Sequence, residues 1–223
     1  MTRIGLIHAT PLAVAPIAAA FERLWPQAQL HNVLDDSLSQ DRARDGQLTP
    51  AMTQRFIDLT GYALGCGCDA ILFTCSAFGP AIEAAARTTS RPALKPNQAM
   101  FDMALATPHP SGVLHLGLLA TFEPSIASMA QELKDMARAL GLVMEIHSAH
   151  VPEAMDDLSR GDADLHHHKL AEALAHLPAC DVIVLAQFSM AAAQPLAQSR
   201  SAVPVLSSPD CAVMALRQRM MHV

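Results

Sequence analysis

Near the start of the chain, Ile4-Gly5-Leu6-Ile7 forms a short apolar run that recurs 112 residues later as Leu116-Gly117-Leu118-Leu119. Two further runs recur at the same separation: Asp69-Ala70-Ile71-Leu72-Phe73 as Asp181-Val182-Ile183-Val184-Leu185, and Pro92-Ala93-Leu94 as Pro204-Val205-Leu206. Single short matches arise by chance, but three runs in step rarely do, so the chain is predicted to be an internal duplication.

Each run is apolar at consecutive positions, which is typical of strands buried on both faces of a parallel sheet. Helical patterns lie between the runs, and the clearest follows the capping pair Thr49-Pro50 and extends from Ala51 to Leu64. Strands that alternate with helices predict an α/β fold with a parallel sheet in each half. Two further helices are expected over residues 124–140 and 165–177.

The other segments complete the predicted domain plan. Second strands are expected at His31–Leu34 and Met144–Ile146, and the charged stretch 35–47 is expected to be a loop. The proline-containing stretch 106–112 is the predicted junction. The first lobe is therefore placed at residues 1–107 and the second at 108–208, with a C-terminal helix at 209–223 as a candidate to cross back to the first lobe.

Composition excludes several classes of protein. The 223 residues are 51% hydrophobic and 16% charged, which predicts a globular chain rather than a disordered one. A net charge of −6 argues against nucleic acid and anionic membranes as partners. The N-terminus lacks the features of a signal peptide, and no apolar run is long enough to predict a membrane span. Five cysteines, an odd number, favour reduced thiols and a cytoplasmic location.

Ligands of open parallel α/β sheets bind beyond the carboxyl ends of the strands. Two such lobes facing each other would form a cleft, lined by the loops that follow the recurring strands. These loops are His8-Ala9-Thr10-Pro11, Thr74-Cys75-Ser76-Ala77-Phe78-Gly79, Thr121-Phe122-Glu123-Pro124 and Gln187-Phe188-Ser189-Met190.

Cys75 is the leading catalytic candidate. It lies two residues beyond a buried strand and before a helix expected to begin near Pro80. Backbone N–H groups and the helix dipole favour a thiolate at such a position, which suits a base, a nucleophile or a proton donor. The alternative is that Cys75 is a small core residue, as free cysteines often are.

The equivalent position in the second half is Gln187, which cannot exchange a proton but can hydrogen-bond a carboxylate or enolate oxygen. Backbone N–H groups and the hydroxyls of Thr10, Ser76, Thr121 and Ser189 could cradle the same oxygens, or could only cap helices. Aromatic and methionine side chains in these loops are expected to form an apolar pocket wall or core packing: Phe78, Phe122, Phe188 and Met190.

Several other motifs are not expected to be functional. Cys66-Gly67-Cys68 has no partner pair at zinc-site spacing, and adjacent residues of the run His166-His167-His168 point to different faces of a helix. A solvated helix start is therefore predicted for the histidines, and no metal is expected. The chain has no glycine-rich phosphate loop, so no nucleotide is expected either.

In combination, these motifs resemble the aspartate/glutamate racemase superfamily, which includes hydantoin racemases, maleate isomerases and arylmalonate decarboxylases. The resemblance covers essentially the whole chain and rests on Ile4–Thr10, Phe73–Ser76, Gly117–Thr121 and Val184–Ala191. It implies two pseudo-symmetric Rossmann-like lobes with the site between them, and catalysis without a cofactor.

Typical racemases of this family use one cysteine per lobe, on opposite faces of the substrate's α-carbon. Cys75 matches the cysteine of the first lobe, whereas Gln187 replaces that of the second. Arylmalonate decarboxylases have one cysteine, in the second lobe, so this chain resembles their arrangement mirrored between lobes. The departure leaves two-thiol racemisation open to question.

We therefore expect an isomerase that moves a proton at the carbon next to a carboxylate or carbonyl, with Cys75 as its acid/base. A decarboxylase-like lyase, a covalent cis–trans isomerase and a binding protein that has lost catalysis are the alternatives. The substrate is expected to be a small carboxylate or carbonyl compound, and Met220 and Met221 are candidates for either a homo-oligomer interface or the core. The predicted substrate-binding residues are His8, Thr10, Ser76, Thr121, Phe122, Gln187, Phe188 and Ser189.

Overall fold

The computed structural model describes residues 2–221, without the side chain of Pro124. The chain divides into two compact units, one built from residues up to Ala99 together with those from Pro209 onward, and the other from Met100–Ser208. Each unit contains a four-stranded sheet in which every neighbouring pair of strands is parallel. The fold is therefore α/β with a parallel sheet in each half, as predicted.

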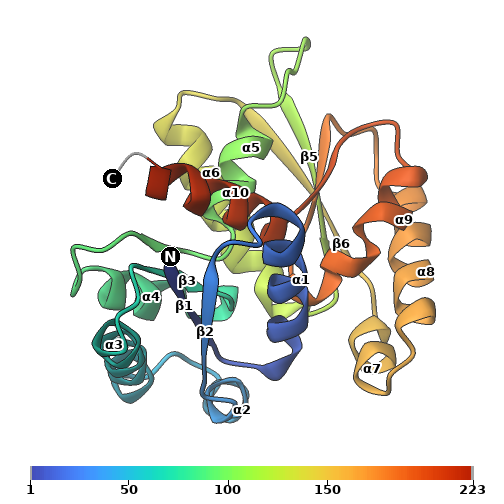
Figure 1. Cartoon of the computed structure of the whole chain (residues 1–223). Helices are drawn as coiled ribbons and strands as arrows, with labels where there is room; N and C mark the ends of the chain where they lie inside the picture. The colour runs from blue at the N-terminus through green and yellow to red at the C-terminus, as the bar shows by residue number, and fades with distance from the viewer. Residues whose placement is uncertain (1, 222–223) are drawn as a thin grey trace. The chain divides into compact units, whose positions relative to one another are not determined.

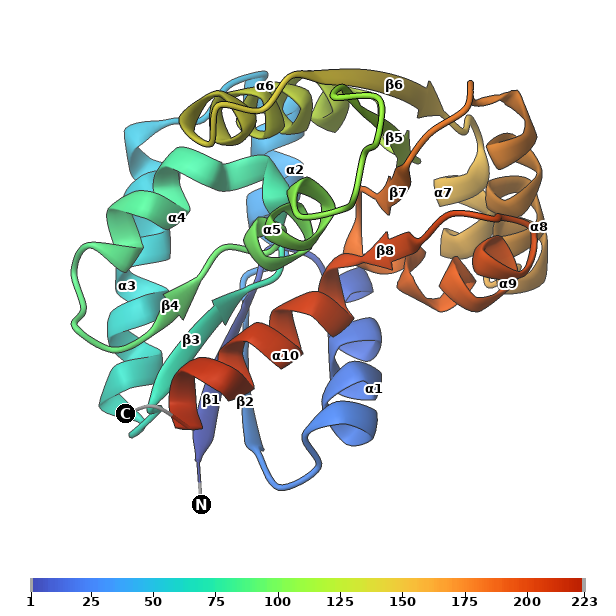
Figure 2. The same cartoon turned by 90° about the horizontal axis from the view of Figure 1, so that it is seen from above.

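The sheet of the first unit has the strand order β2-β1-β3-β4. Its inner strands are apolar on both faces, and Ile4, Leu6 and Ile71 are fully buried. Figures 1 and 2 show helices covering both faces of this sheet, which is the physical reason for the continuous apolar runs. The strands are β1 (Arg3–His8), β2 (Gln29–Leu34), β3 (Ala70–Phe73) and β4 (Ala93–Leu94).

The helices of the first unit form two groups. Helices α3 and α4 lie side by side on one face of the sheet, and α1 and α10 lie on the other (Figure 2). Arg23 of α1 pairs with Asp210 of α10 at 2.9 Å, and this pair fastens the C-terminal helix to the N-terminal one. The helices are α1 (Val14–Leu24), α2 (Ser37–Asp45), α3 (Pro50–Gly65), α4 (Gly79–Ala86) and α10 (Ser208–Met221), with short 3-10 turns η1 (Pro11–Ala13) and η2 (Ser76–Phe78).

The sheet of the second unit repeats this arrangement with the order β6-β5-β7-β8. Its strands are β5 (Leu114–Ala120), β6 (Met144–His150), β7 (Val182–Leu185) and β8 (Val205–Ser207). Helices α8 and α9 lie on one face and α6 on the other (Figure 2). The helical segments are α5 (Gln98–Leu105), α6 (Pro124–Ala139), α7 (Ala154–Ser159), α8 (Ala163–Ala173), η3 (Leu174–His176), η4 (Phe188–Ala193) and α9 (Gln194–Ser199).

The two sheets share one register, which confirms the duplication. Ile4 pairs with Ala70 in the first sheet, and Leu116, 112 residues on, pairs with Val182 in the second. Side-chain contacts repeat in the same way, because the carboxylates of Asp69 and Asp181 accept hydrogen bonds from the backbone N–H groups of Arg3 (2.9 Å) and His115 (2.8 Å). The changeover between the compact units falls inside α5, so the lobe limits of 1–107 and 108–208 stay a prediction.

Equivalent glycines explain how tightly each sheet packs against its helices. A Cβ atom added at Gly5 would lie 2.8 Å from Cδ1 of Ile71 and 3.1 Å from Cβ of Ala63. A Cβ atom added at Gly117 would lie 3.0 Å from Cδ1 of Leu177 and 3.1 Å from Cγ1 of Ile183. Both central strands therefore need a glycine where the covering segments approach the sheet.

The expected loop at 35–47 is wrong, because Ser37–Asp45 forms helix α2. The helix is charged on most sides and buries only Leu38, so it lacks the broad apolar stripe by which surface helices are recognised. Arg55 of α3 holds it from outside by pairing with Asp35 and with Asp41 at 2.7 Å. Gly46, at φ 67°, ends it in the left-handed conformation that glycine tolerates best.

The other predicted helices and strands are confirmed, with extended second strands, and residues 222–223 of the expected C-terminal helix lie outside the described residues. Thr49 caps α3 by accepting a hydrogen bond from Met52 N at 3.3 Å, and α6 begins at Pro124 as expected. Strands β2 and β6 are longer than predicted because their sequences mix polar and apolar residues, as edge strands do. No helix within residues 2–221 has the length and apolarity required to cross a membrane.

The prediction of a solvated start to the histidine-rich helix is wrong for His166. That side chain is completely buried, and His168, two positions on, is exposed, as the helical geometry requires. Neither ring nitrogen of His166 has a hydrogen-bond partner among the described residues. Burial, with a smaller contribution from His167, lowers the pKa of His166 to about 4, against the opposing effect of Asp157.

We predict that Gly5→Ala destabilises the protein by about 1–3 kcal/mol, because Ala63 cannot move out of the way of the new methyl group. Gly61→Ala is the matched control: it lies inside α3 with nothing within 4 Å of the added atom, and should stabilise by about 0.5–1 kcal/mol. Urea unfolding followed by circular dichroism measures both changes. Equal effects of the two substitutions would contradict the proposed close packing at Gly5.

We predict that the free energy of unfolding decreases as the pH falls from about 6.5 to about 4. In this range the histidine is protonated in the unfolded chain, whereas buried His166 of the folded protein stays neutral. The loss from this residue is at most about 3 kcal/mol. His166→Leu sacrifices no hydrogen bond and should flatten this part of the stability curve. Urea unfolding at pH 7 and pH 5 measures the effect, and an unchanged pH dependence in the variant would refute it.

Candidate functional site

In the first unit, the ends of β1 and β3 bring His8 and the loop Thr74–Gly79 together. The two strands are parallel neighbours, with Ile7 opposite Phe73, so the residues that follow them leave the sheet side by side. The backbone N–H of Thr74 donates to the carbonyl of Ile7 at 3.1 Å. This edge is where ligands of open α/β sheets bind.

Cys75 lies in extended backbone immediately before the η2 turn and α4. Its half-buried side chain packs beside the apolar core of the first unit, and its sulfur is hydrogen-bonded by the backbone N–H of Ala77. The hydroxyl of Ser39 in α2 also reaches the sulfur, and that hydroxyl donates to the carbonyl of Ala9 at 2.6 Å. Cys75 therefore lies at the turn where it was expected, and both its catalytic role and the alternative of a small core residue stay predictions.

Burial raises the pKa of the Cys75 thiol, while the Ala77 N–H and the Ser39 hydroxyl act in the opposite direction. The single hydroxyl proton of Ser39 is engaged by Ala9, so it must turn away from that carbonyl to stabilise a thiolate. Burial outweighs the local hydrogen bonds, and Cys75 rests as a protonated thiol at neutral pH. The expectation that its position would favour the thiolate is thus opposed by desolvation.

A polar network of buried His8 and Thr74 with exposed Asn32 begins at the residue before Cys75. Nδ1 of His8 is 2.8 Å from Oγ1 of Thr74, and Nε2 is 2.9 Å from Oδ1 of Asn32. Burial lowers the pKa of His8, against the hydrogen bond to Asn32, so the ring is neutral at pH 7. With both nitrogens engaged, the ring joins the ends of three strands and orients the residue that precedes Cys75.

The two hydroxyl residues predicted in this unit lie in the same loops. Thr10 caps η1, where its Oγ1 accepts from Leu12 N at 3.4 Å, and its side chain is half-buried. Ser76 is the first residue of η2 and is also half-buried. A capping role for Thr10 is present, and a substrate contact by either residue stays a prediction.

In the second unit, Gln187 follows β7 as Cys75 follows β3. Its Oε1 accepts from the backbone N–H of Thr121 at 2.9 Å and from the Thr121 hydroxyl at 3.2 Å. Its Nε2 donates to Oγ of Ser125 at 2.7 Å. The amide therefore fixes the turn after β5, and a substrate contact by its second N–H stays a prediction.

The polar network beside Cys75 has no counterpart in the second unit. The residues equivalent to His8 and Thr74 are Ala120 and Ala186, and both are fully buried. Only the strand position of Asn32, opposite Leu6, is polar again, as Ser148 opposite Leu118. The duplicated frame is kept, but the thiol and the neighbouring histidine at these strand ends are found in the first unit alone.

The aromatic residues of the loops differ in exposure. Phe78 packs against Phe56 with ring centroids 5.0 Å apart, and Met190 is fully buried, so both are core residues. Phe188 is 4% exposed, whereas Phe122 is 40% exposed. Of the two predicted for substrate contact, Phe122 is the one whose surface is open.

Sequence reasoning missed Ser39 and Asn32. Ser39 lies in the stretch expected to be a loop, and it reaches Cys75 only because that stretch is a helix lying across the end of the sheet. Asn32 lies inside a predicted strand, and its polar side chain was the only sign of a functional contact there. Its place opposite Leu6 became known from the structure. Ser189, the remaining predicted binding residue, lies in η4 and is half-buried. The cleft between the lobes stays a prediction.

Comparison with known proteins gives one consistent result. The family model described as Asp/Glu/Hydantoin racemase matches residues 7–216. No curated protein sequence matches the chain significantly. Among solved structures, allantoin racemase from Klebsiella pneumoniae is 16% identical, with a TM-score of 0.74 over 100% of this chain and 89% of that one.

Two further solved structures are similar in fold. Glutamate racemase from Bacillus anthracis is 15% identical, with a TM-score of 0.71 over 99% of this chain and 82% of its own. An aspartate racemase homologue from Pyrococcus horikoshii is 15% identical, with a TM-score of 0.70 over 99% and 100%. At these identities the likeness shows a shared fold and does not transfer a substrate.

We predict that iodoacetamide alkylates Cys75 with a pH midpoint above the ordinary thiol value of about 8.5, because burial raises its pKa. Ser39→Ala should move the midpoint further up, since it removes a group that lowers this pKa. Mass spectrometry separates Cys75 from the other four cysteines, and Cys75→Ser identifies its adduct. An alkylation midpoint below that of an unfolded control peptide would show that the pKa of Cys75 is lowered, and would contradict this prediction.

Proposed function

Because the chain belongs to the Asp/Glu/hydantoin racemase family, we propose that it is a cofactor-independent isomerase with Cys75 as its acid/base. Cys75 would exchange a proton with the carbon next to a carboxylate or carbonyl of a small substrate. The observation that carries the proposal is the position of the thiol at the carboxyl end of β3, held by the Ala77 N–H and the Ser39 hydroxyl. That position is where ligands of this fold class bind.

The protonation state defines the role of Cys75 in this proposal. A thiol that is protonated at rest can deliver a proton to a carbanion or enolate, and the thiolate so formed is stabilised by Ala77 and Ser39. The isomerase would begin with the reverse step: Cys75 first loses its proton to solvent, and the thiolate takes the α-proton while the C–H electron pair stays on the substrate as an enolate. The new thiol or a water molecule then returns a proton to that carbon. His8, neutral and hydrogen-bonded at both nitrogens, would position Thr74 and the loop rather than take part in proton transfer.

A second candidate, a decarboxylase-like lyase, is favoured by Gln187. An amide cannot return a proton to the opposite face of the substrate, so one thiol serves one face only. In decarboxylation this suffices: the bond to the departing carboxylate breaks, its electron pair stays on the α-carbon as an enolate, CO₂ leaves, and Cys75 protonates the carbon. The arrangement resembles that of arylmalonate decarboxylases mirrored between lobes.

The proposal assigns the remaining loop residues to substrate recognition. Hydroxyls of Thr10, Ser76 and Ser189 and turn N–H groups would bind the carboxylate or carbonyl oxygens. The Thr121 hydroxyl would join them by turning its proton away from Gln187. Phe122, which is exposed, would contact the apolar part of the substrate. All five cysteines are free, in keeping with the proposed cytoplasmic location.

We predict that the protein catalyses exchange of an α-hydrogen for deuterium in D₂O, and that Cys75→Ala slows this exchange by at least about 100-fold. Proton NMR detects the exchange whether or not the configuration inverts, so the assay does not depend on the final product. Amino acids, hydantoins including allantoin, and α-substituted malonates form the substrate panel. Cys180→Ala is the matched control, because Cys180 lies before the amino end of β7, away from the loops.

The outcomes separate the candidates. Exchange accompanied by inversion supports the isomerase, whereas CO₂ release from a malonate with uptake of a single deuterium supports the lyase. Full activity of Cys75→Ala on a confirmed substrate would refute both. Tight binding of a panel compound with no exchange and no CO₂ release would identify a binding protein instead.

A further inference from the structure

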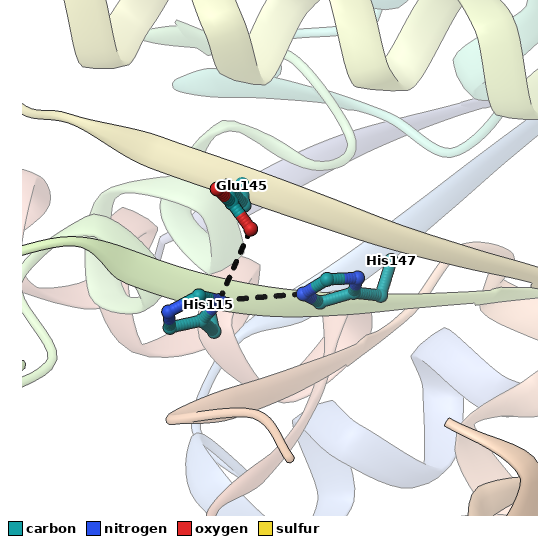
Figure 3. A group of neighbouring side chains, drawn as sticks. All are labelled: His115, Glu145 and His147. Carbon is teal, nitrogen blue, oxygen red and sulfur yellow. Dashed lines mark hydrogen bonds and ion pairs between the residues drawn. The ribbon is translucent and has the colours of Figure 1, made fainter. Parts of the chain in front are cut away.

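Three potential metal ligands meet on the second sheet, outside the candidate active site. His115 lies on β5, and Glu145 and His147 lie on the adjacent edge strand β6. Figure 3 shows the three side chains converging on one face of these strands. His115 is directly opposite Glu145 in the ladder, and His147 is the next residue of β6 on that face.

The ligand atoms are already close to metal-binding geometry. Nδ1 of His115 is 3.3 Å from Nε2 of His147 and 3.6 Å from Oε2 of Glu145. All three ligand atoms lie within 4.8 Å of one another. Two ligands at about 2.0–2.2 Å from a tetrahedral zinc ion are separated by roughly 3.3–3.5 Å, so only small side-chain rotations are needed.

From this geometry we propose that His115, Glu145 and His147 form a Zn²⁺ site, with water as the fourth ligand. Two imidazoles and one carboxylate suit zinc among the common divalent ions, since magnesium and calcium prefer oxygen ligands alone. The carboxylate supplies one negative charge, and its side chain is 61% exposed, so it can turn toward an ion without disturbing the core.

The backbone around the site is rigid, which reduces the cost of ordering the ligands. The N–H of His115 donates to the carboxylate of Asp181 at 2.8 Å, and all seven residues of β5 are paired with β6. His147 lies opposite Gly117, where Leu177 and Ile183 pack against the strand and hold it in place. The rings of His115 and His147 are nearly parallel, with centroids 5.6 Å apart.

The site lies at the opposite end of β5 from the loops of the candidate active site. His115 is six residues before Thr121, which corresponds to about 20 Å along a strand. The zinc ion would therefore link the edge strand β6 to β5, far from the proton transfer proposed for Cys75. Failure of either proposal leaves the other standing.

The test is isothermal titration of tag-free, chelator-treated protein with ZnCl₂. We expect one Zn²⁺ per chain, and binding at least about tenfold weaker in His147→Ala, since changes even to outer-shell partners of a metal commonly cost that much. His150→Ala is the matched control, because His150 is an exposed histidine of the same strand on the opposite face. Excess Zn²⁺ should also raise the Tm of the wild type but not that of His147→Ala.

Circular dichroism without zinc checks that each variant is folded. Glu145→Gln supplies a second test, because its exposed side chain can be changed without disturbing the fold. Weaker binding in both His147→Ala and Glu145→Gln, with His150→Ala unchanged, supports the site. Equal zinc affinity of wild type and His147→Ala, or an equal loss in His150→Ala, overturns it. Absence of binding at millimolar ZnCl₂ overturns it too, and would identify the contact as a histidine pair hydrogen-bonded without an ion.

Discussion

Parallel pairing between the first and third strands of each sheet is the constraint on which the rest of the structure depends. Because β1 runs beside β3 and β5 beside β7, the segments that follow them must leave the sheet at one edge. The glycines at positions 5 and 117 allow the covering segments to approach these strands closely. The residues that we assign to catalysis or recognition lie in the loops at this edge, and Ser39 reaches Cys75 from helix α2.

Duplication preserved this frame and let the chemistry diverge. The first unit holds a thiol beside the buried pair His8 and Thr74, which the exposed Asn32 completes from β2, whereas the second holds Gln187 beside two buried alanines. A buried polar network is stable only when all its groups are hydrogen-bonded, so it is retained as a whole or replaced by small apolar residues. The two strand ends therefore differ in chemistry, with a thiol at position 75 and an amide at the equivalent position 187.

Desolvation gives Cys75 its character. A thiol at a helix start is usually discussed as an activated thiolate, but here burial raises the pKa of Cys75 against its hydrogen bonds to Ala77 and Ser39. The same effect keeps His8 neutral. A site with a protonated thiol and an uncharged imidazole is suited to donating a proton to a carbanion, and less suited to nucleophilic attack.

The sequence alone determined the α/β class, the duplication with its 112-residue separation, the inner strands and the position of Cys75 at a strand end, because these depend on local apolar runs and caps. Helix α2 and the burial of His166 could not be predicted, because pairing with Arg55 and packing between helices are not local. Only the tertiary structure brought Ser39 and Asn32 to the neighbourhood of Cys75 and set the protonation of that thiol. It alone also aligned His115 with Glu145 and His147, since the register between two strands is decided by the whole sheet.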